Sequence, residues 1–348
     1  MSDPKDPGLT YRDAGVDIDA QDEGLRRIKA MLLATRTQGV LADLGSFGGM
    51  FAPDLTGVKE PVLVASCDGV GTKLKVAFMT GVHNTVGRDL VNHCVNDILV
   101  QGAAPLFFLD YVATARLSPS VLASIVEGVA TGCRENGCAL LGGETAEMPG
   151  FYADGEYDVA GFVVGLVDKR RIIDGRAIAV GDLLYALPSA GLHTNGYSLA
   201  RKIFFEVAGK QPGDRVPGLP MTIGEALLAP HRSYLGVLRP AIDGGVVHGL
   251  AHITGGGLTD NLPRILPESM SARIARGSWP VLPVFSVMQQ MGRVADDEMY
   301  RAFNMGVGMV CAIAPSDAAA FEAFLDASSE PRFRIGEVVP GERRVLYA

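Results

Sequence analysis

Short apolar runs, each followed at once by a glycine-rich segment, recur along both halves of this chain. The run and its segment are 62–66 with 68–73, 139–141 with 142–144, 182–187 with 189–196, and 250–254 with 255–257. Apolar runs of this length predict buried strands. Glycines at the strand ends allow backbone N–H groups to approach a ligand closely. The pattern therefore predicts strands whose ends carry tight, ligand-facing turns.

Apolar residues recur with helical spacing in the segments between the strands, which predicts a mixed α/β chain. The expected helices include 22–37, 84–101, a helix opened by Ser118 and Pro119, and a segment near 231–242. Further strands are expected at 106–112, 157–167, 307–313 and 334–339. The charged stretch 168–171 separates two such series, so we expect an N-terminal domain over 1–170 and a C-terminal domain over 171–348. A ligand cleft between two domains is a common arrangement.

Composition excludes several classes of function. The chain has 348 residues, a formal net charge of -8 and 48% hydrophobic residues. A negative charge argues against binding to nucleic acid or to an anionic membrane surface. No apolar run approaches the ~20 residues that span a bilayer, and the N-terminus has no apolar core of a signal peptide. Five cysteines without a C-x-x-C pair argue against a zinc ribbon or a disulfide framework, so we expect a cytoplasmic protein.

The familiar nucleotide and hydrolase motifs are missing. The sequence contains no G-x-x-x-x-G-K-[ST], no G-x-G-x-x-G after a strand, no G-x-S-x-G and no H-E-x-x-H. Any phosphate chemistry must therefore use another scaffold.

Three carboxylates stand where a hard cation could be bound. Asp68 ends the first strand, five residues before Lys73, whose ammonium suits a phosphate. Along the helix 84–101, Asp89, His93 and Asp97 recur every four residues; such a face is usually solvated. Apolar neighbours surround Asp97, however, and a carboxylate buried among them needs a partner or a metal. With Glu144 as a third strand-end acid, Asp68 and Asp97 predict a Mg²⁺–ATP cage if the three elements are adjacent.

Two glycine-flanked segments of the second half are candidate ligand contacts. His193 and Asn195 lie in the segment 189–196, and His252 precedes the triple glycine at 255–257. A lone histidine is more often a structural hydrogen-bonding group, and a triple glycine is often only a turn. Both interpretations stay open on the residue pattern alone.

Taken together, these motifs resemble the phosphoribosylformylglycinamidine cyclo-ligase family, the aminoimidazole ribonucleotide synthetases of purine biosynthesis. The matching segments, in order, are 11–19, 68–73, 94–98, 101–103, 108–111, 142–150, 193–198, 252–257 and 303–306. The departures are small: Thr194 stands where the family usually has serine, and Asp260 stands where it usually has glutamate. The ordered series covers nearly the whole chain.

The resemblance implies a fold, a reaction and a set of site residues. It implies a homodimer whose N-terminal sheets join across the interface, a C-terminal α/β domain, and use of ATP and Mg²⁺. The implied reaction closes the imidazole ring of 5-aminoimidazole ribonucleotide from formylglycinamidine ribonucleotide and releases ADP and phosphate. The implied metal ligands are Asp68, Asp97 and Glu144; the nucleotide-binding residues are these three with Gly69, Gly71, Thr72, Lys73, Gly142 and Gly143; the substrate or proton-transfer residues are His193, Asn195 and Lys29.

Related enzymes and a non-catalytic protein are the competing interpretations. Selenophosphate synthetases usually need a reactive cysteine near the N-terminus, and none precedes Cys67. The amidine-forming synthetase lacks the pattern at 143–150, and a thiamin-phosphate kinase is a further relative. A non-catalytic nucleotide-binding protein is expected to lack the acidic ligands, whereas all three are present here.

Overall fold

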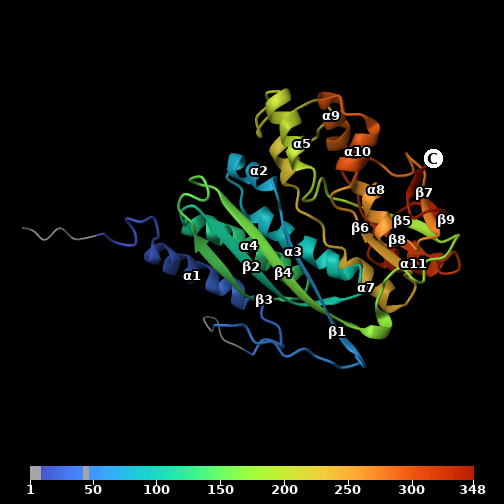
Figure 1. Cartoon of the computed structure of the whole chain (residues 1–348), viewed down its shortest axis with the longest axis horizontal. Helices are drawn as coiled ribbons and strands as arrows, with labels where there is room; N and C mark the ends of the chain where they lie inside the picture. The colour runs from blue at the N-terminus through green and yellow to red at the C-terminus, as the bar shows by residue number, and fades with distance from the viewer. Residues whose placement is uncertain (1–8, 42–46) are drawn as a thin grey trace, which may run out of the picture.

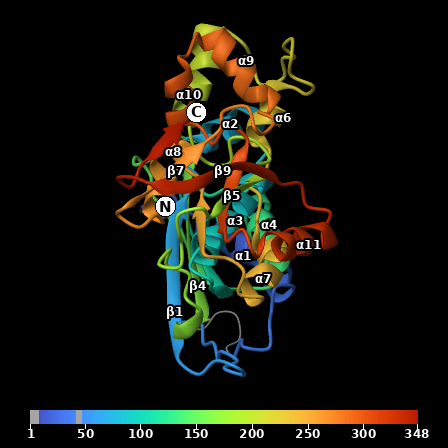
Figure 2. The same cartoon turned by 90° about the vertical axis from the view of Figure 1, so that its right-hand side faces the viewer.

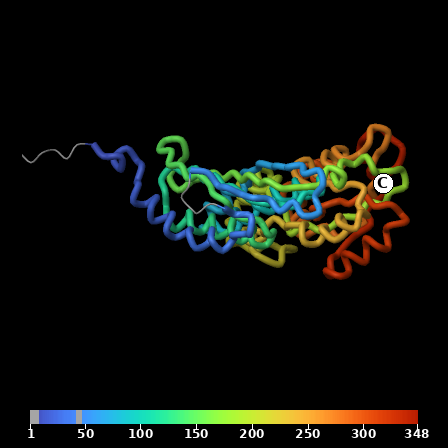
Figure 3. Tube along the Cα trace, turned by 90° about the horizontal axis from the view of Figure 1, so that it is seen from below, coloured from blue at the N-terminus to red at the C-terminus, as the bar shows by residue number. Residues whose placement is uncertain are grey.

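A computed structural model describes residues 9–41 and 47–348. The molecule is elongated, with the N-terminal half at one end and the C-terminal half at the other (Figures 1 and 3). Each half is built on its own sheet, four strands in the first and six in the second. The expected mixed α/β class is confirmed.

The first sheet places its strands in the order β1-β4-β2-β3. The strands are β1 (Pro61–Gly69), β2 (Ala104–Thr114), β3 (Ala139–Glu147) and β4 (Tyr157–Asp168). β4 is antiparallel to both β1 and β2, whereas β2 and β3 are parallel. One row of paired residues crosses the whole sheet and contains Asp68, Gly161, Asp110 and Gly143. This register fixes how far apart the predicted site residues lie.

Two long helices pack on one face of this sheet. They are α3 (Asn84–Leu99) and α4 (Pro119–Glu135), and Figure 2 shows them together on one side of β1 and β4. The apolar stripe of α3 faces the core as its four-residue spacing predicts, since Val86, Leu90, Cys94 and Ile98 are all fully buried. Ser118 precedes α4 and Pro119 opens it, as expected. Two further helices, α1 (Ile18–Leu33) and α2 (Lys73–Thr80), complete this half.

Glycines allow α3 and α4 to approach each other closely. A Cβ on Gly128 of α4 would lie 1.9 Å from the carbonyl oxygen of Asn84, and one on Gly87 of α3 would lie 2.2 Å from that of Ile125. A Cβ on Gly132 would meet Val91 at 2.8 Å. The backbones therefore pack directly against each other where these glycines lie.

The second sheet has the order β10-β7-β9-β5-β8-β6. Its strands are β5 (Leu183–Pro188), β6 (Gly249–His252), β7 (Met270–Ile274), β8 (Val307–Ile313), β9 (Phe333–Pro340) and β10 (Val345–Tyr347). Helices α7 (Leu235–Asp243) and α11 (Ala318–Ala327) contribute Leu238 and Phe321 to the apolar core on one face. The other core includes Leu258 of α8 (Gly257–Asn261) and Trp279.

Shorter helices complete the described chain. They are α5 (Tyr197–Arg201), α6 (Ile223–Leu228), α9 (Pro283–Gly292), α10 (Asp296–Ala302), η1 (Lys169–Arg171), η2 (Lys202–Val207) and η3 (Leu262–Arg264). None of the helices in the described ranges is long and apolar enough to cross a membrane.

Several boundaries differ from those expected. β1 and β3 extend through Gly69 and through Gly142–Gly143, so these glycines lie within strands and not in turns after them. The expected helix near 231–242 begins only at Leu235, because the backbone at 231–234 bonds to polar side chains of α3 instead. Strands β7 and β10 were not expected. The domain boundary at 170/171 falls within η1 and stays a prediction.

We expect Gly128→Ala to destabilise the fold by about 1–3 kcal/mol, because the added methyl group meets backbone atoms of α3. The matched control is Gly236→Ala in α7, where a Cβ meets no atom within 4 Å; helix propensity predicts a gain of about 0.5–1 kcal/mol there. Thermal unfolding of both variants measures the difference. Equal melting temperatures would contradict the close helix contact.

Candidate active site

A cavity of about 550 Å³ lies between the two halves of the chain. Strand β1 and helix α3 line it from the N-terminal half, and strand β6 and helix α8 line it from the C-terminal half. Its polar lining comprises Ser66, Asp68, His93, Asp97, Gln101, Asp174, His252, Thr254, Asn261 and Arg264. The structure therefore brings Asp68 and Asp97 together, as expected, and adds two histidines.

Imidazoles hold both carboxylates of this cavity in place. His93 Nε2 lies 2.7 Å from Asp68 Oδ2 and 3.8 Å from Asp97 Oδ2. Asp97 also interacts with His252 Nδ1 at 2.8 Å and accepts a hydrogen bond from Ser66 Oγ at 2.9 Å. Burial opposes ionisation of Asp97, but the hydrogen bond and charge of His252, with smaller contributions from His93 and Ser66, lower its pKa. The pKa of Asp68 is also lowered, by His93 against the effect of burial.

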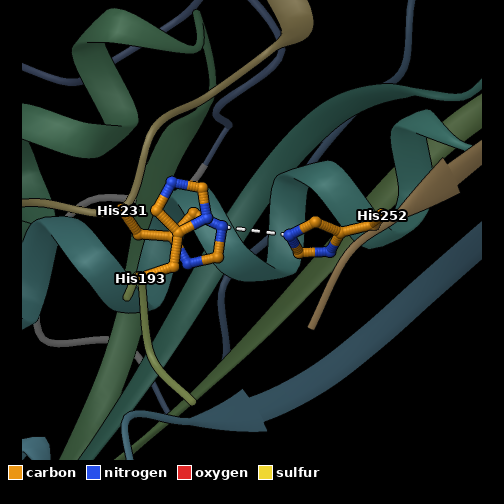
Figure 4. Close-up of side chains that lie close together, drawn as sticks. All are labelled: His193, His231 and His252. Atoms are coloured by element: carbon orange, nitrogen blue, oxygen red, sulfur yellow. Dashed lines mark hydrogen bonds between the residues drawn. The ribbon is translucent and has the colours of Figure 1, made fainter. Parts of the chain in front are cut away.

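A hydrogen-bonded network leads from these carboxylates into the interior. His252 Nε2 lies 3.0 Å from His231 Nε2, the contact drawn in Figure 4. Thr194 Oγ1 joins His231 Nδ1 at 3.3 Å to His93 Nδ1 at 2.7 Å. All four side chains are buried. The network therefore connects Asp97 to Asp68 through three imidazoles and a hydroxyl.

His193 lies behind this network. Its ring is stacked on that of His231, with centroids 4.0 Å apart, and the residue is 1% exposed (Figure 4). Its Nε2 accepts a hydrogen bond from the backbone N–H of Ala190, and its backbone has a φ of 62°. Burial, then the positive charge of His252 and of Lys73, lowers the pKa of His193 well below its usual value. The imidazole is therefore neutral at physiological pH.

Lys73 forms a buried ion pair with Asp89 and also bonds to the backbone of the other half. Its Nζ lies 2.7 Å from Asp89 Oδ2 and donates to the carbonyl oxygens of His193 and Ala229, at 3.0 and 2.9 Å. Both side chains of the pair are fully buried, and Tyr197 also donates to the carbonyl of His193. The structure thus places Lys73 against the backbone of the His193 segment, with its ammonium already bonded. A phosphate-binding role for Lys73 stays a prediction.

Glu144 and Lys29 lie at a second cavity, of about 750 Å³. Helix α1, residues 47–49 and strands β2 and β3 contribute to its lining. Since β4 and β2 separate β1 from β3, three strand spacings place Asp68 roughly 14 Å from this part of β3. Within one chain, the structure therefore does not bring Glu144 together with Asp68 and Asp97.

The remaining predicted residues of the N-terminal half lie in β1, in β3 and in the segment that leads into α2. Gly69 donates its N–H to Asp68 Oδ1, and the exposed Gly71 has a φ of 53° just before Thr72, the N-cap of α2. Gly142 and Gly143 line the second cavity. Only glycine fits at position 143, because a Cβ there would lie 2.1 Å from Asp110 Oδ1.

The predicted site residues did not include His93, Thr194 or His231, and His252 was noted only as preceding the triple glycine at 255–257. The four-residue spacing of Asp89, His93 and Asp97 was the signal for His93, since it predicted one shared helix face. That face is buried at Asp89 and His93, whereas solvation was the more usual expectation. No local pattern pointed to His231.

Family models match both halves of the chain. The model of the AIR synthase related protein N-terminal domain matches residues 55–167, and that of the C-terminal domain matches residues 179–348. The two halves of the chain are thus the N-terminal and C-terminal domains of the AIR synthase related proteins.

Comparison with curated relatives identifies the family within this group of proteins. Phosphoribosylformylglycinamidine cyclo-ligases of Citrifermentans bemidjiense and Geobacillus thermodenitrificans are 52% and 50% identical to it, covering 96% and 95% of this chain and 96% of each relative. That of Desulfitobacterium hafniense is 51% identical over 98% of this chain and 99% of its own. The chain belongs to the phosphoribosylformylglycinamidine cyclo-ligase family. It is an enzyme that closes the ring of aminoimidazole ribonucleotide, and the resemblance found in the sequence is confirmed.

Solved structures of more distant proteins share the fold. A thiamine-monophosphate kinase of Stenotrophomonas maltophilia superposes with a TM-score of 0.66 at 18% identity, over 93% of this chain and 95% of that one. The hydrogenase maturation protein HypE in complex with ATP gives a TM-score of 0.64 at 18% identity, over 98% and 92%. At this identity the likeness concerns the fold alone, so it does not favour the kinase interpretation.

We expect Lys73→Met to destabilise the protein by about 3–5 kcal/mol, because it leaves Asp89 buried without its counter-charge. Adding Asp89→Asn makes both members neutral and should recover part of that loss. Arg88→Met is the control: the adjacent Arg88–Glu135 pair is exposed, so its loss costs at most about 1 kcal/mol. Thermal melts compare the three. A Lys73→Met variant as stable as the control would show that the buried ion pair does not stabilise the fold.

Proposed function

We propose that this enzyme couples ring closure to ATP and Mg²⁺ in the cavity between its two halves. Formylglycinamidine ribonucleotide and ATP are the substrates, and aminoimidazole ribonucleotide, ADP and phosphate are the products. Identity of about 50% to curated cyclo-ligases over almost the whole chain is the observation that carries the proposal. The ATP complex of the fold relative HypE supports a nucleotide as co-substrate.

The reaction explains why a polar cavity is needed. A formamide carbon is a poor electrophile, and its oxygen is a poor leaving group. In the proposed first step, that oxygen forms a bond to the γ-phosphorus of ATP as the bond to ADP breaks. The amidine nitrogen of the same molecule then attacks the activated carbon, and the C–O bond breaks with release of phosphate. Holding the two reacting groups together promotes ring closure.

Asp68 and Asp97 are the proposed ligands of Mg²⁺. Their oxygens face the cavity and are partly exposed, and both pKa values are lowered, so the donors are ionised oxygens of the kind that Mg²⁺ prefers. Bound there, Mg²⁺ would neutralise charge on the nucleotide phosphates. His93 and His252 orient the two carboxylates, as their contacts show.

The other predicted site residues keep their proposed roles. His193 and Asn195 are proposed to act on the substrate or its protons; Asn195 is close to the triple glycine, since a Cβ on Gly255 would lie 3.1 Å from its Oδ1. Lys29 is proposed to contact phosphates, and Glu144 to be a third Mg²⁺ ligand. Within one chain both lie at the second cavity, so these two roles require a partner subunit or a movement of the chain.

An exposed apolar face of the first sheet supports a homodimer. Leu63 of β1 is 67% exposed and Phe162 of β4 is 42% exposed. Leu63 and Cys67 are four residues apart in β1, so their side chains point to the same face of the sheet. Phe162 of β4 is paired with Cys67, so its side chain lies on that face too, opposite α3. A second copy of this sheet would cover that face. The five cysteines are free, which supports the proposed cytoplasmic location.

We expect phosphate release from ATP only when formylglycinamidine ribonucleotide is present, with one aminoimidazole ribonucleotide formed per phosphate. Asp97→Asn should lower turnover at least a hundredfold, because it removes one charged Mg²⁺ ligand. Asp182→Asn, in a His–Asp pair away from the cavity, is the control for turnover. Equal ATP turnover with thiamin phosphate or selenide would refute the proposed reaction.

We expect the chain to sediment as a dimer at micromolar concentration, and Phe162→Asp to shift it to monomer. The introduced charge would have to be buried against the partner's sheet. Val207→Asp is the matched control, since Val207 is 64% exposed on η2 and outside the first sheet. A monomer with full activity would exclude the proposed assembly.

A further inference from the structure

Two imidazoles and two carboxylates meet at one end of the cavity between the halves. We propose that Asp68, His93, Asp97 and His252 form a binding site for a transition-metal dication of the Zn²⁺ class in the nucleotide-free enzyme. Helix α3 and strand β1 supply three of the donors, and strand β6 of the other half supplies His252. Such a metal would join the two halves directly.

Three of the donors already lie close together, and Asp68 contacts one of them. Zn²⁺ binds nitrogen and oxygen at about 2.0–2.2 Å, so neighbouring donors of a tetrahedral site lie about 3.3 Å apart. His93 Nε2 is 2.7 Å from Asp68 Oδ2 and 3.8 Å from Asp97 Oδ2, and His252 Nδ1 is 2.8 Å from Asp97 Oδ1. The ligand atoms of His93, Asp97 and His252 all lie within 4.8 Å of one another.

The atoms opposite the donors are held by other groups, as in known metal sites. His93 Nδ1 bonds to Thr194 Oγ1 at 2.7 Å, and His252 Nε2 bonds to His231 Nε2 at 3.0 Å. Binding requires a lone pair on His93 Nε2 and on His252 Nδ1. Both nitrogens therefore lose their proton when the metal binds. His93 can then donate from Nδ1 to Thr194, and His252 can donate from Nε2 to His231.

The donor set selects the class of metal. Mg²⁺ prefers oxygen ligands and keeps much of its water, whereas imidazole suits Zn²⁺, Co²⁺ and similar ions. The group formed by His193, His231 and His252 is a poorer alternative although its atoms are close. The rings of His193 and His231 are stacked at 21°, so their in-plane lone pairs run side by side and do not converge on one ion (Figure 4).

Occupation by Zn²⁺ would withdraw Asp68 and Asp97 from Mg²⁺ and thereby inhibit the enzyme. This consequence rests on the proposed function, whereas binding of the metal itself does not. The test therefore uses metal alone, without nucleotide or substrate.

The experiment titrates Co²⁺ into full-length protein that has been stripped with a chelator, and records visible absorption. We expect one equivalent of Co²⁺ to give the intense bands of a low-coordinate nitrogen and oxygen site, and Zn²⁺ to abolish them by displacement. Failure to develop these bands would overturn the proposal. If the protein binds Co²⁺ in this way but does not close the ring of its substrate with ATP and Mg²⁺, the proposed function is overturned and the metal site is supported.

Two variants locate the site while preserving the local hydrogen bonds. His252→Asn and His93→Gln each keep an N–H that can reach the carboxylate but remove an imidazole ligand. We expect each to weaken Co²⁺ binding at least tenfold. The matched control is His248→Asn: His248 Nδ1 lies 2.8 Å from Asp182 Oδ2, but His248 belongs to no three-ligand group within 9–41 and 47–348. Equal affinity in control and site variants would overturn the assignment.

Discussion

The contact on which the site depends is the one between the polar face of α3 and the extended backbone at 231–234. Asp89 and Asn92 bond to the N–H and C=O of His231, and Asn96 bonds to the C=O of Arg232 and the N–H of Tyr234. Buried backbone groups without partners would cost several kcal/mol. Side chains from one half thus satisfy the backbone of the other, at positions that local structure leaves unpaired.

This contact determines where the histidines lie. With its backbone held by Asp89 and Asn92, His231 presents one ring nitrogen to Thr194 and the other to His252. Lys73 reinforces the arrangement from the opposite side, because its ammonium pairs with Asp89 and binds the carbonyl of His193. Since all these groups are buried, loss of one leaves another unpaired, so the network is expected to respond as a unit.

The features that the sequence predicts correctly are those that depend on the periodicity of apolar residues. Strand β8 lies at 307–313 as expected, and the apolar stripe of α3 is buried as its spacing requires. The proximity of Asp68 and Asp97 was predicted only on the condition that their elements are adjacent, and the packing of α3 on β1 meets that condition. Glu144 does not meet it, since strand order separates it from Asp68 and no local pattern fixes strand order. Lys73 and His193 show the same limit: a glycine-rich neighbourhood predicted ligand contact, whereas contacts with distant residues bury both.

The chemistry of the partners explains how the cavity keeps its negative character. A lysine or arginine beside Asp68 and Asp97 would supply a permanent positive charge and compete with any cation for them. Here the permanent charge of Lys73 is neutralised by Asp89 behind the cavity, and the cavity carboxylates are held by imidazoles. An imidazole can orient a carboxylate through one N–H without carrying a fixed charge. Against the effect of burial, Asp68 and Asp97 raise the pKa of His93, but an imidazole, unlike a lysine or arginine, readily gives up its proton when a cation binds.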